Sequence, residues 1–249
     1  MRELPPYPES TILVVEVGSG AHGTGLPGRE DHDETAIWIE SPEEVFALRD
    51  FEPRAISVRT KPDGVPSEAG DTDRNLYTLR RFLNLAVAGN PSIMLVFWGP
   101  VLRSNAFGDG LREIAPRFVG RHLVPKYRGY MKAQRDRLLG LRGGRHGHMR
   151  ETDAGYDTKY AMHAARLGAQ GVELLTTGRL ELPVPGLVGN RLREIRHGKW
   201  ELDRVVSWID TLDERLAELA TDESIPLGPQ REGIIEWSVA AHQFSWLNR

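Results

Sequence analysis

Apolar residues occur in short runs in the early part of the chain and at helical spacing in most of the rest. The short runs are rich in β-branched residues and are bounded by turn-forming residues, which is typical of strands. The later apolar positions recur every three or four residues, which predicts amphipathic helices. Strands are predicted at 11–17, 36–39 and 55–60, and helices at 42–50, over the segment from Tyr77 to Ala86, within 104–141, and at 156–177, 202–220 and 234–247. The run 92–98 fits a strand or a buried helix, because periodicity does not distinguish the two in so short a segment.

This order of elements predicts an α+β fold, with an N-terminal sheet flanked by helices and a helical C-terminal part. We place the domain boundary between the last apolar run of the early part and the start of the basic helical pattern. The expected domains are therefore a catalytic domain at 1–103 and a helical domain at 104–249. With 249 residues the chain is long enough to bury a sizeable core in either part.

Composition excludes several kinds of chemistry. The chain contains no cysteine, so disulfides, thiolate nucleophiles and cysteine-based zinc sites are excluded. The formal net charge of -3 argues against a general nucleic-acid coat protein, but it leaves room for a local basic patch. No apolar run approaches the roughly 18 residues that a membrane span needs. We therefore expect a cytoplasmic protein with no membrane partner.

The most informative segment joins the first two predicted strands. The run 11–17 leads directly into Gly18-Ser19, and Asp31 and Asp33 stand just before the second run. Glycine lets a phosphate approach the backbone closely, and the N–H groups of Gly18 and Ser19 can bind it. Side chains two residues apart on a strand point to the same face, so Asp31 and Asp33 can share a metal site.

A phosphate cradle beside a carboxylate pair predicts nucleotidyl transfer. Two Mg²⁺ ions held by carboxylates would stabilise the attacking and leaving oxygens when a nucleoside triphosphate such as ATP loses pyrophosphate. A third carboxylate is expected from Asp71 or Asp73. We favour Asp73, which should lie just before the helix that carries Tyr77 and could accept the proton of an attacking hydroxyl. Simpler interpretations remain open, since an Asp-x-Asp pair is often a solvated turn and Asp73 fits a helix N-cap equally well.

A dinucleotide-binding fold is the main alternative for the same segment. Gly18, Gly20 and Gly23 match the G-x-G-x-x-G pattern, and Glu40 stands where a ribose-binding acid is expected. That fold needs a helix after the glycines and a second strand parallel to the first. The connection 24–35 contains two glycines and a proline and is too short for such a helix. We therefore set this alternative aside.

The helical part carries basic residues at helical spacing. Lys159, His163 and Arg166 fall on one face. If Lys159 and Arg166 face the acidic site, they would neutralise a bound triphosphate, although a solvated or salt-bridged helix face explains them equally well. His163 fits an interior histidine better than a catalytic one. The basic residues between 112 and 137 could bind the phosphates of an RNA acceptor, but an ordinary solvated surface is the simpler interpretation.

In their order along the chain, these motifs resemble the polymerase-β-type nucleotidyltransferase superfamily, and in particular the RlaP family of predicted nucleotidyltransferases, which is associated with RNA repair and occurs in bacteria and phages. The resemblance covers most of the chain. It rests on Gly18-Ser19, His22-Gly23-Thr24, Asp31-His32-Asp33, Asp73, Tyr77-Thr78-Leu79-Arg80-Arg81-Phe82, Gly89-Asn90-Pro91-Ser92, Gly155-Tyr156-Asp157-Thr158-Lys159, His163, Arg166-Leu167 and Leu192-Arg193-Glu194-Ile195-Arg196. It implies a nucleotidyltransferase-type mixed sheet, Mg²⁺ at Asp31 and Asp33, and nucleotide binding at Gly18 and Ser19. Glu30 and Ala36 depart from residues that are frequent in the family, and neither departure removes a ligand.

The sequence therefore predicts a metal-dependent nucleotidyltransferase that moves a nucleoside monophosphate from an NTP to an acceptor. RNA (a tRNA end, for example), a protein side chain or a small molecule could be that acceptor. The expected catalytic metal ligands are Asp31, Asp33 and Asp73, and the expected nucleotide-binding residues are Gly18, Ser19, Lys159 and Arg166. The alternative is a non-catalytic nucleotide- or nucleic-acid-binding module of the same fold. The sequence sets neither the acceptor, nor the preferred base, nor the oligomeric state.

Overall fold

The computed structural model describes residues 3–26, 32–46, 55–61, 70–142 and 154–248. Contacts between residues divide the chain into two compact units. The first, which we call the sheet unit, comprises Met1–Ala88, Ser92–Phe118 and Gln230–Arg249; the second, which we call the helical unit, comprises Gly89–Pro91 and Val119–Pro229. Among the described residues, no helix is both long enough and apolar enough to cross a bilayer.

The sheet unit is built on a mixed sheet. In the part of the chain that the structure describes, five strands lie in the order β3-β4-β2-β1-β5. Strands β2 and β4 run parallel, and the other neighbouring strands run antiparallel. The strands are β1 (Thr11–Val17), β2 (His32–Trp38), β3 (Ala55–Arg59), β4 (Thr72–Thr78) and β5 (Val101–Ser104). The helices are α1 (Gly18–His22), α2 (Pro42–Phe46), α3 (Leu79–Val87), α4 (Pro91–Met94), α5 (Ala106–Glu113) and α10 (Arg231–Leu247), with 3-10 turns η1 (Leu95–Phe97) and η2 (Ala115–Phe118).

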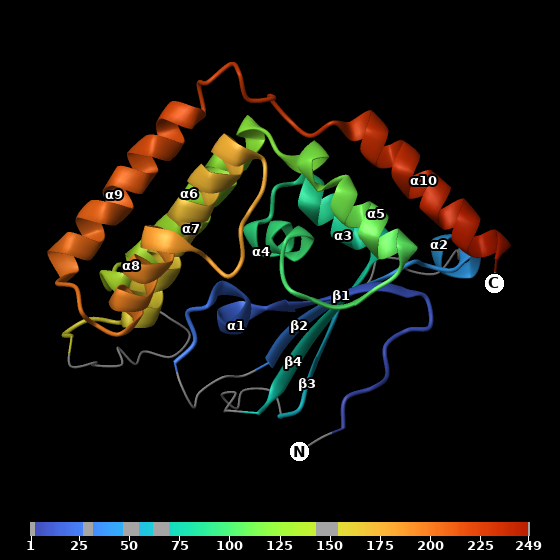
Figure 1. Ribbon diagram of the computed structural model, residues 1–249, viewed down its shortest axis with the longest axis horizontal. Helices are drawn as coiled ribbons and strands as arrows, with labels where there is room; N and C mark the ends of the chain where they lie inside the picture. The colour runs from blue at the N-terminus through green and yellow to red at the C-terminus, as the bar shows by residue number, and fades with distance from the viewer. Residues whose placement is uncertain (1–2, 27–31, 47–54, 62–69, 143–153, 249) are drawn as a thin grey trace. The chain divides into compact units, whose positions relative to one another are not determined.

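Strand alternation gives the sheet two apolar faces. On one face Val14, Ala36, Trp38 and Leu76 are buried together, and the N-terminal segment packs against them through Tyr7. The residues that alternate with these along the strands face the opposite side, which the helices cover. Helices α3, α5 and α10 lie on that same side of the sheet (Figure 1). Both faces of the sheet therefore contribute buried apolar residues.

The helical unit packs around α7. Its elements are η3 (Arg121–Leu123), α6 (Val124–Leu138), α7 (Thr158–Thr177), α8 (Gly186–Arg196) and α9 (Leu202–Leu219). Helices α6 and α9 both run beside α7 (Figure 1). A Cβ on Gly168 would lie 2.7 Å from Met131 Sδ of α6 and 2.9 Å from Leu212 Cβ of α9. Glycine at this position therefore lets the three helices approach closely.

The predicted fold class is confirmed: a mixed sheet flanked by helices comes first, and a helical part follows. Two strands were not predicted: β4 at 72–78, which reaches into the start of the helix expected from Tyr77, and β5 at 101–104. The helix expected from Tyr77 begins instead at Leu79. The ambiguous run 92–98 is helical, formed by α4 and η1.

The division by contacts also differs from the expected boundary between 103 and 104. Strand β5 pairs with β1, and α5 follows β5 directly and packs on β1, so both belong to the sheet unit. Helix α10 belongs to the same unit although it comes last in the chain. Pairings over such sequence distances leave no local signal in the sequence. The functional domains proposed at 1–103 and 104–249 stay a prediction.

Candidate active site

Two carboxylates lie side by side near the amino-terminal ends of β2 and β4. The two strands are parallel, and Asp33 is the register partner of Asp73. Partners on neighbouring strands point to the same face, with the strands about 4.8 Å apart. Both aspartates are half-buried. The sheet thus brings together two of the three predicted metal ligands.

Gly18 lies directly against the Asp33 carboxylate. Strand β1 ends at Val17, the register partner of Asp33, and the chain turns there into α1. Gly18 has φ of +72°, and a Cβ at this position would overlap Oδ2 of Asp33. Glycine is therefore required both for the left-handed backbone and for the space that the carboxylate occupies.

Ser19 is the second residue of the short helix α1 and is half-buried. The first N–H groups of a helix have no acceptor within the helix. In the described part of the chain, no side chain caps this helix end. The backbone around Gly18 and Ser19 thus offers donors beside the Asp33 carboxylate, which is the arrangement that a phosphate cradle next to a metal site needs.

The dinucleotide-binding alternative is excluded by the sheet. Strands β1 and β2 are antiparallel neighbours, whereas that fold requires a parallel pair joined by a crossover helix. Helix α1 contains only the five residues Gly18–His22 and ends at Gly23, which has φ of +66°. Setting this alternative aside was therefore correct.

The position of Asp73 corrects two interpretations from the sequence. Asp73 lies within β4 and not just before a helix. The N-cap of α3 is Thr78, whose hydroxyl accepts a hydrogen bond from the N–H of Arg81 at 3.2 Å, so the N-cap interpretation of Asp73 was wrong. Asp73 Oδ1 accepts a hydrogen bond from Arg59 Nε at 2.8 Å across the β3–β4 pair.

Asp71 has a different environment. Its side chain is buried, accepts a hydrogen bond from Thr60 Oγ1 at 3.2 Å and forms an ion pair with Lys61 Nζ at 3.0 Å. Its backbone oxygen accepts a hydrogen bond from His32 N at 2.8 Å. These contacts hold the ends of β2, β3 and β4 together. Of the two candidates for the third carboxylate, Asp73 is thus the one in register with Asp33.

These residues fit a hard divalent cation. Carboxylate oxygens are the ligands that Mg²⁺ prefers, and two like charges on neighbouring strands are unfavourable unless a cation lies near them. Asp31, the other predicted ligand, lies outside the described residues. Within the described ranges, no group of three metal-binding side chains is found. The metal role of Asp31, Asp33 and Asp73 therefore stays a prediction.

The predicted basic face of the helical unit is present on α7. Arg166 Nη2 lies 3.2 Å from His163 Nδ1, so these residues share a face as expected. Burial lowers the pKa of His163 to about 3, and the positive charges of Arg166, Lys159 and Arg196 lower it further in the same direction. His163 is therefore neutral at pH 7. That Lys159 and Arg166 face the acidic site stays a prediction, since they belong to the other unit.

The basic set between 112 and 137 is partly used within the fold. Arg128 Nη2 pairs with Asp213 at 2.7 Å, and Arg135 Nη2 pairs with Asp210 at 3.1 Å. Lys132 pairs with Asp136 at 3.4 Å on its own helix. Because these cations join α6 to α9 or to itself, they are better explained as structural residues than as a nucleic-acid surface.

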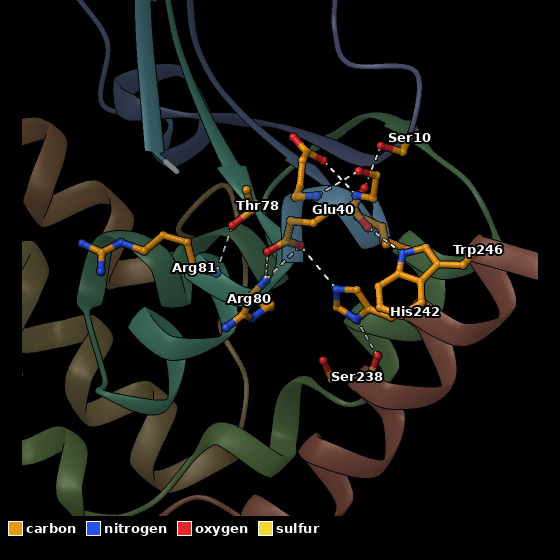
Figure 2. Close-up of polar contacts among 11 residues, drawn as sticks. Ser10, Glu40, Thr78, Arg80, Arg81, Ser238, His242 and Trp246 are labelled. Carbon is orange, nitrogen blue, oxygen red and sulfur yellow. Dashed lines mark hydrogen bonds and ion pairs between the residues drawn. The ribbon is translucent and has the colours of Figure 1, made fainter. Parts of the chain in front are cut away.

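Sequence reasoning missed a buried polar cluster at the far ends of β2 and β4. Glu40, which follows β2, is 1% exposed. Its carboxylate accepts a hydrogen bond from the N–H of Arg80 at the start of α3, at 3.3 Å, and lies 3.3 Å from His242 Nε2 of α10. Trp246 Nε1 donates to the backbone oxygen of Glu40 at 2.7 Å. Figure 2 shows Glu40 between α3 and α10, so this residue fastens the C-terminal helix to the sheet.

The protonation states in this cluster follow from its partners. His242 Nδ1 lies 2.8 Å from the carbonyl oxygen of Ser238, and Nε2 faces the Glu40 carboxylate. Both partners of the ring are acceptors. Burial raises the pKa of Glu40, but hydrogen bonds from His242, from its own backbone N–H and from Thr78, with a coulombic contribution from His242, lower it overall. The cluster is therefore a buried set of polar contacts whose role is structural.

Together, a mixed sheet with carboxylates in register beside a glycine turn defines a protein of the polymerase-β-type nucleotidyltransferase class. A family model described as RlaP, the RNA repair pathway DNA polymerase beta family, matches residues 6–224, and the chain belongs to this family. No curated protein matches the sequence. A solved structure of a nucleotidyltransferase-like protein from Exiguobacterium sibiricum is similar with 10% identity and a TM-score of 0.31, over 86% of this chain and 70% of that chain.

Proposed function

We propose that the protein is a metal-dependent nucleotidyltransferase that moves a nucleoside monophosphate from an NTP to an acceptor hydroxyl. The observation that carries this proposal is the register of Asp33 with Asp73 on neighbouring strands, together with the contact of Asp33 with Gly18. Membership in a polymerase-β-type family supports the same reaction class. Like charges on neighbouring strands are unfavourable in themselves, and the ion pair between Arg59 and Asp73 supplies one cation beside them.

In the proposed reaction, the acceptor oxygen forms a bond to the α-phosphorus of the NTP. The bond from the α-phosphorus to the oxygen that bridges to the β-phosphate breaks, and pyrophosphate leaves. Asp73 accepts the proton of the acceptor hydroxyl. The backbone N–H groups of Gly18 and Ser19 hold the phosphates, and Lys159 and Arg166 are the proposed cationic contacts in the helical unit.

The proposed cofactor is a pair of Mg²⁺ ions, with Asp31, Asp33 and Asp73 as the protein ligands. Bound there, the metal would supply charge stabilisation at the attacking and leaving oxygens. The description of the family names an RNA repair pathway, and this supports an RNA end as the acceptor. A cytoplasmic location stays a prediction.

The test is an incorporation assay with the full chain. Wild-type protein, Mg²⁺ and each α-labelled NTP are incubated with 3′-hydroxyl RNA, and transfer of label to RNA is measured with release of pyrophosphate. Asp33→Asn and Asp73→Asn should each lose the activity. Asp210→Asn is the matched control, because Asp210 is an exposed aspartate on α9, outside the site, and its ion pair among the described residues is with Arg135.

Undiminished incorporation by both site variants would reject the proposal. Retained NTP binding with no transfer by the wild type, to RNA or to other hydroxyl acceptors, would instead favour the non-catalytic binding module. Such a module should also keep NTP binding in Asp33→Asn and Asp73→Asn. Activity that persists after chelation of divalent metal would contradict the proposed cofactor.

A further inference from the structure

One side of α6 in the helical unit is hollowed and carries two cations and an exposed aromatic ring. The hollow measures about 380 Å³, and its lining includes Lys126, Gly129, Tyr130, Ala133 and Arg137. These positions fall at helical spacing, so they lie along one side of α6, which we call the hollowed face. Lys126, Gly129 and Tyr130 are exposed and the other two are partly exposed, so this face is accessible to a ligand.

The two cations of the hollowed face are not matched within the fold. Among the described residues, no ion pair involves Lys126 or Arg137. The one acidic residue of α6 is Asp136, and it already pairs with Lys132 at 3.4 Å. The hollowed face therefore carries positive charge that its own helix does not neutralise, and this charge is complementary to a polyanion.

The side of α6 that faces α9 provides a contrast on the same helix. Arg128 binds Asp213 through two hydrogen bonds of 2.7 Å, and Arg135 pairs with Asp210 at 3.1 Å. Each of these arginines stands two positions along the chain from a cation of the hollowed face, which is roughly 200° around an α-helix. The helix thus uses one set of cations to join its neighbour and leaves another set on the opposite side.

Gly129 lies in the middle of α6, where the fold itself does not require a glycine. Glycine destabilises a helix interior relative to alanine. The backbone of Gly129 is not left-handed, and an added Cβ would have nothing within 4 Å. By contrast, a Cβ on Gly171 of α7 would lie 2.9 Å from Tyr127 Cδ1, so that glycine is needed for packing. At position 129 the missing side chain leaves the helix backbone open to close approach by a ligand.

Tyr130 presents an aromatic ring beside this open backbone. The residue is 41% exposed, and its hydroxyl accepts a hydrogen bond from Asn90 Nδ2 at 3.5 Å. Asn90 belongs to the same unit, so one end of the tyrosine is held while much of the side chain stays in contact with solvent. Surfaces that bind single-stranded nucleic acids combine aromatic rings, on which bases stack, with cations that contact the phosphates.

We propose that the hollowed face of α6 binds single-stranded RNA, with a base stacked on Tyr130 and phosphates on Lys126 and Arg137. The helical rise puts the Cα atoms of the two cations roughly 16 Å apart, a span of several nucleotides. An exposed ring favours a single strand over a duplex, whose bases are not free to stack. The inference rests on the proposed function, because it names a surface that holds the acceptor RNA away from its reacting end.

The experiment is a fluorescence anisotropy titration of the full chain with a labelled oligouridylate of about 12 nucleotides. It is done in EDTA and without NTP, so that binding is measured apart from transfer. Lys126→Gln and Arg137→Gln should each lower the slope of log affinity against log salt by about 0.7, the value for one phosphate contact with a single strand. Lys132→Gln is the matched control, because Lys132 is an exposed lysine of the same helix that already has a carboxylate partner.

The ring and the glycine are tested by variants that should fold. Tyr130→Ala should weaken binding about tenfold, the loss of one stacked base, whereas Tyr130→Phe should bind like the wild type. Gly129→Gln should raise the urea midpoint, because glutamine is the better helix former, and should still weaken RNA binding by covering the open backbone. A duplex of the same length should bind more weakly than the single strand.

Several results would overturn the proposal. One is failure of the wild type to bind oligouridylate at low salt. Another is an equal effect of Lys126→Gln, Arg137→Gln and Lys132→Gln, or equal binding by Tyr130→Ala and Tyr130→Phe. If poly-glutamate displaces the RNA equally well from the wild type and from Tyr130→Ala, the hollowed face attracts acidic chains in general and is not an RNA surface.

The same assay separates this inference from the proposed function. The double variant Asp33→Asn with Asp73→Asn should bind oligouridylate like the wild type, although it should lose transfer. Binding that depends on Tyr130, in a protein that transfers no nucleotide, would leave the RNA surface standing and reject the proposed reaction. Transfer by a wild type whose RNA binding is unchanged in Tyr130→Ala would reject the RNA surface alone.

Discussion

The pair of parallel strands β2 and β4 has acidic residues at both of its ends. Asp33 and Asp73 lie near the amino-terminal ends, which we call the near ends, and Glu40 follows β2 at the opposite, far ends. The two ends differ in how their carboxylates are matched. At the far ends, Glu40 is enclosed, and it contacts the Arg80 N–H of α3, the ring of His242 and, through its backbone oxygen, the indole of Trp246. At the near ends, Asp33 and Asp73 are half-buried and face each other across the strand pair. At the far end the carboxylate is matched by donors from α3 and α10, and the near end places two carboxylates side by side, with Arg59 as a cation beside Asp73.

This difference separates a structural carboxylate from a candidate catalytic pair. A buried carboxylate with matched donors stabilises the elements that it joins, here β2, α3 and α10. Two carboxylates in register do not stabilise a sheet, and Arg59 contributes one cation to the pair. Arrangements that are unfavourable for folding are expected mainly where chemistry requires them. The near end is therefore the better candidate for function.

The largest expected effect comes from neutralising Asp33. Asp33→Asn should reduce nucleotidyl transfer by about 100-fold or more, equivalent to about 2.7 kcal/mol of transition-state stabilisation. Its free energy of unfolding should stay within about 0.5 kcal/mol of the wild type, because one of two like charges is removed without a change of shape. Activity assays and urea unfolding measure the two quantities on the same samples. A large loss of stability would show that Asp33 is structural, like Glu40.

The opposite pattern is expected at the far end. Glu40→Ala should lower the free energy of unfolding by about 2–3 kcal/mol, because it leaves the Arg80 N–H and the His242 ring buried without their acceptor. Transfer per folded molecule should be retained. Glu218→Ala is the control: Glu218 forms an exposed ion pair with Arg215, and such pairs contribute about 0.5 kcal/mol or less. If Glu40→Ala folds as stably as this control, the far-end cluster does not hold α10.

The sequence predicts the near end better than the far end. Strand β1 and the glycine turn at Gly18 are local patterns, and both lie where they were expected. Strand β4 reads Thr-Asp-Arg-Asn-Leu-Tyr-Thr and has too few apolar residues to show a strand period, so it was missed. The register of Asp33 with Asp73 depends on that strand and could not be deduced without it.

The far-end cluster leaves no local signal at all. Glu40 and His242 are separated by 202 positions, and neither residue belongs to a motif that requires the other. In the sequence alone, Glu40 was noted only as the acid of a dinucleotide-binding pattern.

A smaller effect is expected from Gly18→Ala, which should separate steric overlap with Asp33 from backbone strain. Gly18→Ala forces a Cβ into the Asp33 carboxylate and also strains a residue with φ of +72°. Gly140→Ala is the matched control, with φ of +70° and nothing within 4 Å of the added Cβ. Both variants should lose about 1–2 kcal/mol of stability from the left-handed backbone. Only Gly18→Ala should also lose transfer activity, because Asp33 must move. Equal activity of the two variants would contradict the close contact of Gly18 with Asp33.

The smallest expected effect is a pH dependence that belongs to the far end alone. Glu40 has its pKa lowered from 4.5, since the hydrogen bonds from His242, its own N–H and Thr78 outweigh the burial that raises it. A carboxyl with a lowered pKa in the folded state contributes stability that is present above its unfolded pKa and lost as the pH falls through the folded value. Wild-type stability should therefore fall more steeply than that of Glu40→Gln below pH 4.5, in urea unfolding measured at a series of pH values. Because His242 and the Arg80 N–H still face the amide oxygen of the glutamine, the two proteins should differ mainly in this slope. Parallel curves over the acid range would mean that folding does not shift the pKa of Glu40, and the contacts that distinguish the far end of β2 and β4 would not stabilise its ionised form.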